Sequence, residues 1–159
     1  MSDQGEPQPA IALATREDLD ELLALMRAYC DFYEAAPTDA MLLELSRALI
    51  ADPEHEGIQL IARDERSKAV GFATVFWSWD TTEGSRIGIM NDLYVLNQAR
   101  GSRLADRLIE ACLERCALRG AARLEWQTGP ENLRAQGVYD RVGGVREPWL
   151  TYTIAIPRV

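Results

Sequence analysis

A strand-like stretch that runs through a basic, glycine-bearing turn into a helical pattern is the feature that most limits what this chain can fold into. It is LYVLNQARGSRLADRLIEA, residues 93–111. A helix N-terminus exposes unpaired backbone N–H groups with partial positive charge, and glycine in the turn lets a phosphate approach the backbone. The pattern indicates an anion site at Gly101, with Arg100 and Arg103 adding charge.

Arg103 occupies the place where such a turn would most naturally have a second glycine. A glycine is needed there only if the position requires a positive φ. We expect residue 103 to lie in the first helical turn, where an arginine fits without strain and can bind a phosphate as a charged fork. Two alternatives stay open: a solvent-facing side chain, or one that blocks the phosphate position.

The hydrophobic period changes along the chain and predicts the order of its elements. A short strand is expected at 10–14, with Thr15 as an N-cap and Asp18 in the reach-back position of a helix that continues to about residue 33. Asp39 is expected to cap a second helix, which ends at about Ala51. The later elements are strands at 57–64, 68–80 and 86–96, a helix at 101–119, a strand at 122–128, a helix at 132–142 and a last strand at 147–156.

This order predicts an α/β (α+β) fold in one domain over residues 10–159, after a disordered N-terminal lead at 1–9. The three middle strands have hairpin-like joints, so the central sheet should be mixed, mostly antiparallel, with about six to seven strands and about four flanking helices. Gly120 should end the helix at 101–119.

The spacing of apolar residues also predicts which side chains are buried. On the helix at 101–119 we expect an inward side and a solvent side, and we expect Trp126 and Trp149 to be packing residues. The inward residues are Leu104, Leu108, Ile109, Cys112, Leu113 and Cys116, and the solvent-facing ones are Asp106, Arg107, Glu110, Glu114 and Arg115.

Composition excludes several classes of protein. The net charge of −8 argues against nonspecific nucleic-acid binding, and no apolar run approaches the ~20 residues of a membrane span. Three cysteines and a polar, acidic N-terminus without signal-peptide character favour the cytoplasm, and one histidine in the chain argues against a metal site. Residues 1–92 sum to −11 and residues 93–159 to +3, so the back half should attract anions, unless these charges only solvate the surface.

Two stretches in this order resemble the GNAT superfamily, the Gcn5-related N-acetyltransferases. LYVLNQARGSRLADRLIEA is similar to that family's motif A, where Arg100 and Ala105 match the first and last positions and Arg103 departs from a glycine. LEWQTGPENLRAQGVYDRVGG, residues 124–144, is similar to motif B, with Asn132, Ala135 and Tyr139 at the recurring positions. The resemblance covers about residues 10 to 156. The second motif is similar to that of the branch of the family that acetylates histones, polyamines and some amino acids.

The resemblance implies acetyl-CoA as the acyl donor. Its diphosphate would bind the amides of ARGSRLA, and its pantetheine arm would lie beside the strand that ends in DLYV, like an added strand. An amide near Leu93 would polarise the thioester carbonyl. The cofactor-binding residues implied are Leu93, Tyr94, Val95, Arg100, Gly101, Ser102, Arg103, Leu104, Ala105, Asn132, Ala135 and Tyr139.

The same resemblance implies direct transfer of the acetyl group to an amine. Tyr139 would be the acid that protonates the leaving thiolate, and the bland alternative is a core aromatic. Asp92 is the candidate base, although many relatives have an acid one place earlier, where this chain has Asn91. Asp92 is equally well explained as a satisfied strand-end residue, and a water chain is the other route for the proton.

The acceptor pocket of such a fold would lie between the first two helices and the middle strands. Its candidate residues are Tyr29, Phe32, Tyr33, Glu34, Trp77 and Trp79, which would suit a cationic amine through cation–π contacts and charge. Tryptophans in a strand are more often core or dimer-interface residues. The acidic front half favours a polyamine, a lysine-bearing peptide or an amino-sugar, and a homodimer is compatible with the family.

Two other functions compete with an N-acetyltransferase. One is a non-catalytic acyl-CoA-binding regulatory module that retains the fold, which the departures at Asn91 and Arg103 keep open. The other is a protein-interaction domain without a ligand, which the two motifs argue against.

Overall fold

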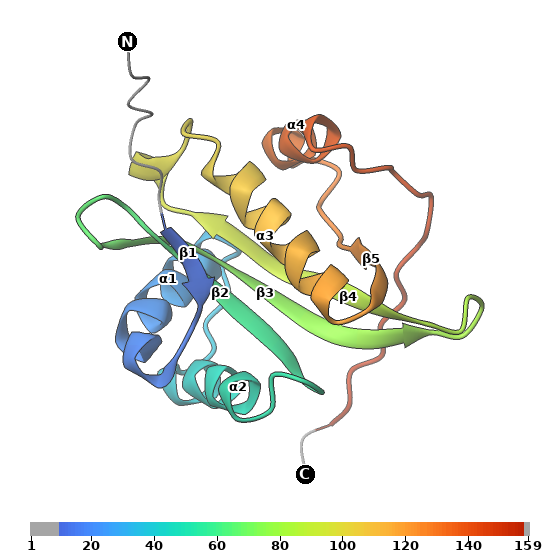
Figure 1. Cartoon of the computed structure of the whole chain (residues 1–159), viewed down its shortest axis with the longest axis horizontal. Helices are drawn as coiled ribbons and strands as arrows, with labels where there is room; N and C mark the ends of the chain where they lie inside the picture. The colour runs from blue at the N-terminus through green and yellow to red at the C-terminus, as the bar shows by residue number, and fades with distance from the viewer. Residues whose placement is uncertain (1–9, 158–159) are drawn as a thin grey trace.

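The computed structural model describes residues 10–157 as a five-stranded sheet with helices on both faces (Figure 1). The disordered lead expected at 1–9 lies outside the described residues. The elements are β1 (Ala10–Leu13), α1 (Leu19–Phe32), α2 (Asp39–Ala51), β2 (Gly57–Arg63), β3 (Ala69–Asp80), β4 (Ser85–Val95), α3 (Leu104–Leu118), β5 (Ala121–Glu125) and α4 (Leu133–Arg141), with short 3₁₀ turns at Arg16–Asp18 and Asn97–Ala99.

The strands lie in the order β1-β2-β3-β4-β5. The first three pairings are antiparallel and β4 pairs with β5 in parallel, because α3 connects those two strands. The α/β class and the mixed, mostly antiparallel sheet are therefore confirmed. The expected count of about six to seven strands is wrong by at least one, because residues 147–156 form no strand.

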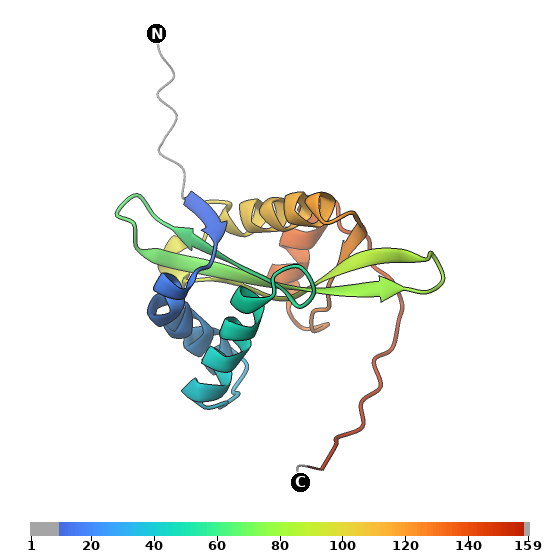
Figure 2. The same cartoon turned by 60° about the horizontal axis from the view of Figure 1, so that its bottom comes forward.

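Each face of the sheet packs against its own helices. Figure 2 shows α3 on one side of the sheet and α1 and α2 on the other. Neighbouring residues of one strand point to opposite faces: Leu60 of β2 lies in the cluster with Leu108 of α3, whereas Ile61 lies in the cluster with Leu22 of α1. β2 and the first half of β3 are therefore buried on both faces, and the inner strands hold the outer elements in place.

The two N-terminal helices begin much as the sequence predicts. The backbone N–H of Thr15 donates to the Asp18 carboxylate at 2.7 Å, which is the expected reach-back contact. The second helix differs in one residue, because its cap is Thr38. The Thr38 hydroxyl oxygen accepts from the Met41 N–H at 3.3 Å, and Asp39 is the first residue of the helix. A hydroxyl at the N-cap satisfies an N–H group that has no partner within the helix.

α3 differs from the prediction at three points. It begins at Leu104 instead of residue 101, because Arg103 has a left-handed backbone. Asp106, expected on the solvent side, is buried, and Leu113, expected inside, is exposed. The apolar pattern of one helix does not show which of its charged residues pair with distant ones. In the fold, Asp106 pairs with Arg141, which lies 35 residues later. Gly120 follows the helix at φ +72°, as expected for a C-terminal glycine.

Residues 144–157, the part of the chain after α4 that the structure describes, form no helix or strand. Trp149, expected to be a packing residue, is exposed, whereas Trp126 packs against Tyr139 with a ring-centroid distance of 5.2 Å. Residues 147–156 have the alternation of a strand but meet no strand edge within the described chain. Alternation of apolar and polar residues shows that one face of a strand is suited to burial. It does not show which surface covers that face.

Candidate active site

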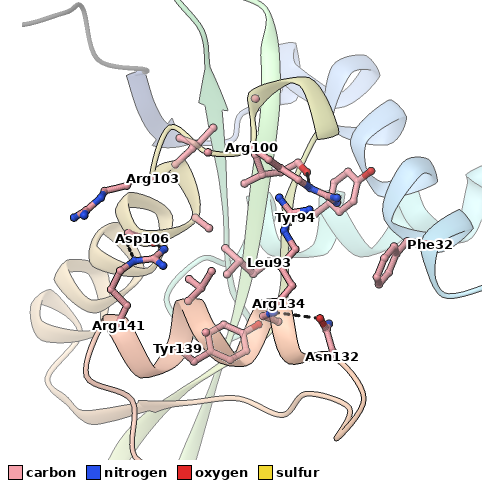
Figure 3. Close-up of a pocket in the computed structure, with 18 of the residues that line it drawn as sticks. Phe32, Leu93, Tyr94, Arg100, Arg103, Asp106, Asn132, Arg134, Tyr139 and Arg141 are labelled. Carbon is pink, nitrogen blue, oxygen red and sulfur yellow. Dashed lines mark hydrogen bonds and ion pairs between the residues drawn. The ribbon is translucent and has the colours of Figure 1, made fainter.

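A cavity of about 580 Å³ lies where α1, the end of β4, the start of α3 and α4 meet (Figure 3). Eleven of the twelve predicted cofactor residues line it: Leu93, Tyr94, Val95, Arg100, Gly101, Arg103, Leu104, Ala105, Asn132, Ala135 and Tyr139. Three predicted acceptor residues, Tyr29, Phe32 and Tyr33, line the same cavity from α1. The fold thus brings segments that are more than a hundred residues apart to one place.

The turn before α3 has the backbone of an anion-binding loop. Gly101 has φ +89°, and a Cβ added there would meet nothing within 4 Å, so the space beside the turn is open. Arg103 has φ +57° and ψ 23° and is the N-cap of α3. The expectation that residue 103 lies in the first helical turn is wrong. A non-glycine residue with this backbone conformation costs about 1 kcal/mol of stability. Strain of this kind occurs mainly at functional sites, where a residue is kept for its side chain.

Three arginines of the cavity have no carboxylate partner within residues 10–157: Arg100, Arg103 and Arg134 form no ion pair there. The Arg100 Nε donates to the Val95 carbonyl at 3.0 Å and its guanidinium lies 5.8 Å from the Tyr94 ring centroid. Arg103 and Arg134 are exposed. Cations that are not neutralised by the protein give the cavity a positive potential and favour an anionic ligand.

The fourth arginine of the cavity, Arg141, is committed to the fold. Its Nε and Nη2 donate to the two Asp106 oxygens at 2.9 and 2.6 Å, a bidentate pair that joins the first turn of α3 to α4 (Figure 3). The hydrogen bonds from Arg141 lower the pKa of Asp106, against the effect of its burial. This pair fixes the spacing between two walls of the cavity.

The edge of β4 is open at the cavity. β4 pairs with β5 at Arg86, Gly88 and Ile89, and no β5 partner continues beyond Ile89. The register against β3 also shifts there, since Thr74 faces Asp92 and Val75 faces Met90, which leaves one extra residue of β4 between them. Such a bulge bends a strand. β5 therefore does not cover β4 at residues 93–95, and an extended ligand could add there as a strand.

Asp92 is half-buried on β4 and has three side-chain partners but no cation. The Asn91 amide donates to it at 3.0 Å, the neighbouring Thr74 and Tyr29 hydroxyls also favour its charged form, and the Tyr29 hydroxyl donates to the Asn91 carbonyl at 3.5 Å. Burial raises the pKa of Asp92, and these three hydrogen bonds oppose that rise because they favour the charged form. A carboxylate with a raised pKa can accept a proton near neutral pH.

A second buried residue fixes the direction of one of these hydrogen bonds. The Gln59 Nε2 donates to the Thr74 hydroxyl oxygen at 3.2 Å, and both side chains are buried. With a donor already on its oxygen, the Thr74 hydroxyl directs its own hydrogen to Asp92. The chain Gln59–Thr74–Asp92 therefore supports the carboxylate from inside the sheet. The sequence gives no signal for this chain of hydrogen bonds, because Gln59 and Thr74 become neighbours only when β2 pairs with β3.

Tyr139 lies on α4 and faces Leu93 of β4 across the cavity (Figure 3). Its ring packs edge-on against Trp126, and burial raises the pKa of its hydroxyl. A phenol that is protonated at neutral pH can act as a proton donor. Asn132, two turns earlier, is the N-cap of α4 and accepts from the Ala135 N–H at 3.2 Å, so this position also has a structural role.

A small second cavity of about 20 Å³ adjoins the first. It is lined by Met90, Asn91, Trp126 and Gln127, and it shares four residues with the larger cavity: Tyr29, Tyr33, Leu93 and Tyr139. Four of its eight lining residues are aromatic: Tyr29, Tyr33, Trp126 and Tyr139. The Asn91 side chain, which bonds to Asp92, lies at this end. The arrangement gives a narrow aromatic recess beside a carboxylate.

Five predicted site residues line neither cavity, and the first is Asp92, the candidate base described above; the others are Ser102, Glu34, Trp77 and Trp79. The Ser102 hydroxyl donates to the Ala99 carbonyl at 2.8 Å, and Glu34 follows α1 in a left-handed turn. The Trp77 indole donates to the Pro53 carbonyl at 2.9 Å, and Trp79 is exposed with the Arg86 guanidinium 4.8 Å from its ring centroid. The two tryptophans lie three and five residues beyond Thr74 in β3, which places them about 10 and 17 Å along the strand from Asp92.

Sequence inspection missed several lining residues of α4, chiefly Arg134, Val138 and Arg141. They recur at spacings of four and three, so they lie on one side of the helix. That spacing was a usable signal.

Comparison with known proteins identifies the class. Residues 22–144 match the family model "Acetyltransferase (GNAT) family". "Uncharacterized N-acetyltransferase YhfO" of Bacillus subtilis (strain 168) is 29% identical over 133 residues, which cover 84% of this chain and 87% of that protein. A crystal structure of a probable acetyltransferase superposes with a TM-score of 0.82 at 27% identity, covering 94% of this chain and 99% of that one.

An acetyltransferase solved with a bound ligand has the same fold. AAC(6′)-Iy in complex with the bisubstrate analogue CoA-S-monomethyl-acetylneamine has a TM-score of 0.80 at 22% identity, covering 94% of this chain and 100% of that one, which is a likeness of fold. The chain belongs to the GNAT family of acetyltransferases. It is an N-acetyltransferase, as the resemblance of its two motifs predicted.

Proposed function

We propose that this chain transfers the acetyl group of acetyl-CoA directly to a primary amine of a small cationic molecule or peptide. The observation that carries the proposal is a cavity where an open β4 edge meets a positively charged glycine turn, adjoined by a small recess lined by Asn91, whose amide bonds to Asp92. Within residues 10–157, no helix is long and apolar enough to cross a membrane. The three cysteines are free and buried, which suits the proposed location in the cytoplasm.

Acetyl-CoA fits this cavity by its chemistry. Its phosphates are anions, and Arg100, Arg103 and Arg134 offer cations beside the open space at Gly101. Its pantetheine arm is an extended chain with amides, which can bond to the β4 edge at residues 93–95, where β5 no longer pairs. This assignment places the thioester near Leu93, between Asp92 and Tyr139.

The reaction then needs two proton transfers. The acceptor must lose a proton to become a nucleophile, and we assign that proton to Asp92, directly or through water. The amine nitrogen forms a bond to the acetyl carbon, and the carbon–sulfur bond breaks. The backbone N–H of Leu93 would polarise the thioester carbonyl, and the Tyr139 hydroxyl would protonate the leaving thiolate.

The recess favours a slender amine. Tyr29, Tyr33, Trp126 and Tyr139 surround a space of only about 20 Å³, which suits an alkylammonium end better than a bulky group. A polyamine, a lysine side chain or an aminomethyl group of an amino-sugar has such an end. Acceptors of these classes would present their remaining atoms to the acidic front half of the chain.

The test combines binding with turnover. Calorimetric titration with acetyl-CoA should show one site per chain, and an amine panel with mass detection should show acetylated product. Tyr139→Phe should lower kcat about 100-fold and leave the affinity for acetyl-CoA within a factor of two, because only the hydroxyl group that donates the proton is removed. Tyr152→Phe, at an exposed tyrosine outside both cavities, is the matched control and should not change turnover.

A non-catalytic acyl-CoA-binding module is the second candidate. Asn91 in place of an acid and the left-handed Arg103 favour it. The same experiments separate the two, since a module of this kind would bind acetyl-CoA but release no thiol with any amine. Absence of acetyl-CoA binding would reject both.

A further inference from the structure

Most of the buried polar side chains of the described chain belong to one connected group. The buried polar or charged residues of the part that the structure describes are Ser46, Gln59, Thr74 and Asp106. Asp106 has its ion pair with α4, and the other three are joined through Met26 of α1. The Ser46 hydroxyl donates to the Met26 sulfur at 3.7 Å. The Gln59 Nε2 donates to the same sulfur at 3.5 Å and to the Thr74 hydroxyl oxygen at 3.2 Å.

This group reaches the proposed base along a row across three strands. Thr74 of β3 lies opposite Gln59 of β2 on one side and opposite Asp92 of β4 on the other. Side chains of directly opposite residues lie on one face of a sheet and within contact distance. The face is the one that α1 covers, because Met26 contacts Gln59 there. A residue deep in the core is thereby linked to Asp92, although it lines neither cavity.

The Met26 sulfur determines which way the Gln59 amide points. A thioether can accept a hydrogen bond but cannot donate one, so the amide must turn its NH2 group toward it. The second hydrogen of that NH2 group goes to the Thr74 hydroxyl oxygen. The Thr74 hydroxyl then has its own hydrogen left for Asp92, whose charged form it favours. A reversed amide would offer its oxygen to Thr74 and draw that hydrogen away from Asp92.

A role in stability does not account for a glutamine at position 59. Residues 57 to 62 of β2 are all buried. The Gln59 Oε1 is buried too, and it has no hydrogen-bond partner within residues 10–157. A buried acceptor without a partner lowers stability, and an apolar side chain would avoid that loss. What Gln59 supplies to its surroundings is therefore the pair of N–H donors.

We propose that Gln59 is a positioning residue for Asp92: its amide, oriented by Met26, holds the Thr74 hydroxyl as a donor and so keeps Asp92 in its proton-accepting form. This inference rests on the proposed function of Asp92 as the base. Gln59 itself touches no substrate and exchanges no proton. Ser46 of α2 supports the arrangement by donating to the Met26 sulfur from its other neighbour helix.

The titratable and charged groups around Asp92 come from α1 and α4. They are Tyr29 and Cys30, with Tyr33 and Tyr139 near Tyr29 and with Arg27 and Asp31 near Cys30. Burial raises the pKa of Tyr29, Cys30 and Tyr139, so these three stay neutral as the pH falls. All six are unchanged in the variants below, so a difference between variants reports on Asp92.

Carbon-13 NMR of the Asp92 carboxyl group tests the inference without the reaction. The signal is identified by its loss in Asp92→Asn, and its titration is followed in the free chain. Gln59→Leu should move the midpoint about half a pH unit higher, about threefold in proton affinity, because Thr74 is no longer held as a donor. Ile61→Val, on the same face of β2, is the matched control and should lower stability without moving the midpoint. An unmoved midpoint in Gln59→Leu would overturn the proposal.

Two further variants separate this route from a change in packing. In a Thr74→Val background, Gln59→Leu should move the midpoint no further, whereas additive shifts would mean that Gln59 does not act through Thr74. Met26→Leu keeps the size of the side chain and removes the sulfur acceptor, so it should move the midpoint in the same direction by a smaller amount. Urea unfolding should show Gln59→Leu to be at least as stable as the wild type, since the unpartnered oxygen is gone.

The pH–rate profile of the same variants distinguishes this inference from the proposed function. If the acidic limb follows the NMR midpoint from variant to variant, Asp92 is the base and Gln59 positions it. If the midpoint moves and the limb does not, the positioning stands and Asp92 is not the base. If turnover changes while the midpoint stays fixed, the positioning role is rejected and the enzyme assignment is unaffected.

Discussion

The two ends of the long β3–β4 hairpin use charged groups in opposite ways. At the turn end, Arg123 of β5 pairs with Asp80, Glu83 and Glu125. At the cavity end, Asp92 has no cation, and arginines such as Arg134 have no carboxylate within the described residues. The turn end satisfies its charges internally, whereas the cavity end leaves them available to a ligand.

The pKa shifts follow the same division. Hydrogen bonds from Thr82 and Arg123 lower the pKa of Asp80, whereas burial raises the pKa of Asp92. The stabilisation from Asp80 is present above its unfolded-state pKa and is lost as the pH falls through the folded value. Asp92 has the opposite sign: its contribution is present only at low pH and is lost as the pH rises through the folded value. At neutral pH the ionised Asp80 therefore stabilises the fold, whereas the ionised Asp92 does not.

The largest effect expected at the cavity end is that of Asp92→Asn. An amide cannot accept the acceptor's proton, so kcat/KM should fall about 100- to 1000-fold. The melting temperature at neutral pH should not fall, because the ionised Asp92 contributes no stability there. Steady-state kinetics over a pH range and thermal unfolding measure both. In the wild-type chain the rate should decline as the pH falls through the pKa of Asp92.

Asp80→Asn at the turn end is the matched control with the same chemical change. Activity should be unchanged and stability at neutral pH should fall, because the hydrogen bonds to Thr82 and Arg123 lose a charged acceptor. If the two variants behave alike in both measurements, the contrast between the ends is wrong. If Asp92→Asn stays fully active, a water chain and not Asp92 is the base.

Arg134→Gln should show the next largest effect. Arg134 is exposed and unpaired within residues 10–157, so its loss should not change stability, but the affinity for acetyl-CoA should fall about tenfold. Titration calorimetry at low and high salt measures this, and the wild-type affinity should show the steeper salt dependence. Arg123→Gln, the control at the turn end, should lower stability and leave the affinity unchanged.

Thr74→Val should have a smaller, pH-dependent effect. The variant keeps the shape of the side chain but removes the hydroxyl that bonds to Asp92, so the pKa of Asp92 should rise further. The acidic limb of the pH–rate profile should move to higher pH, and the rate below neutral pH should fall a few-fold. Thr74→Ser should restore the wild-type profile, which a packing defect alone would not allow.

The other titratable groups around Asp92 should not produce this shift. Tyr29 and Cys30 of α1 interact with Asp92, and Tyr33 and Tyr139 lie close to Tyr29. Burial raises the pKa of Tyr29, Cys30 and Tyr139, so these groups stay neutral over the acidic range. A profile that does not move in Thr74→Val would mean that the acidic limb does not report Asp92.

Sequence could predict the parts of the site that lie within one local pattern. The glycine turn before α3 and the cap and tyrosine of α4 are local, because residues three to seven apart on a helix share a face whatever the rest of the chain does. Gly101, Asn132 and Tyr139 all line the cavity as expected. The same reasoning gave the order and type of the elements as far as residue 141.

Sequence could not predict the parts that depend on strand register or on distant pairs. Trp77 was expected in the acceptor pocket, but a strand of twelve residues is far longer than the cavity, and register alone decides which residue reaches it. The contacts between Gln59 and Thr74 and between Asp106 and Arg141 join residues 15 and 35 apart. The positive φ of Arg103 had one signal, the glycine that the motif has at this position, but the arginine itself gives no sign of it.

Arg103→Gly should give the smallest effect and tests whether strain at the cavity end serves binding. Glycine adopts a φ of +57° without a steric penalty, so the variant should gain stability, by about 1 kcal/mol at most because glycine also loses more chain entropy on folding. The affinity for acetyl-CoA should fall about threefold, since one exposed charge beside the phosphates is lost. Urea unfolding and calorimetry measure the two changes. Arg103→Lys keeps the charge and the strain, so it should change neither property. If the glycine variant binds acetyl-CoA more tightly than the wild type, Arg103 obstructs the phosphate position instead of occupying it usefully.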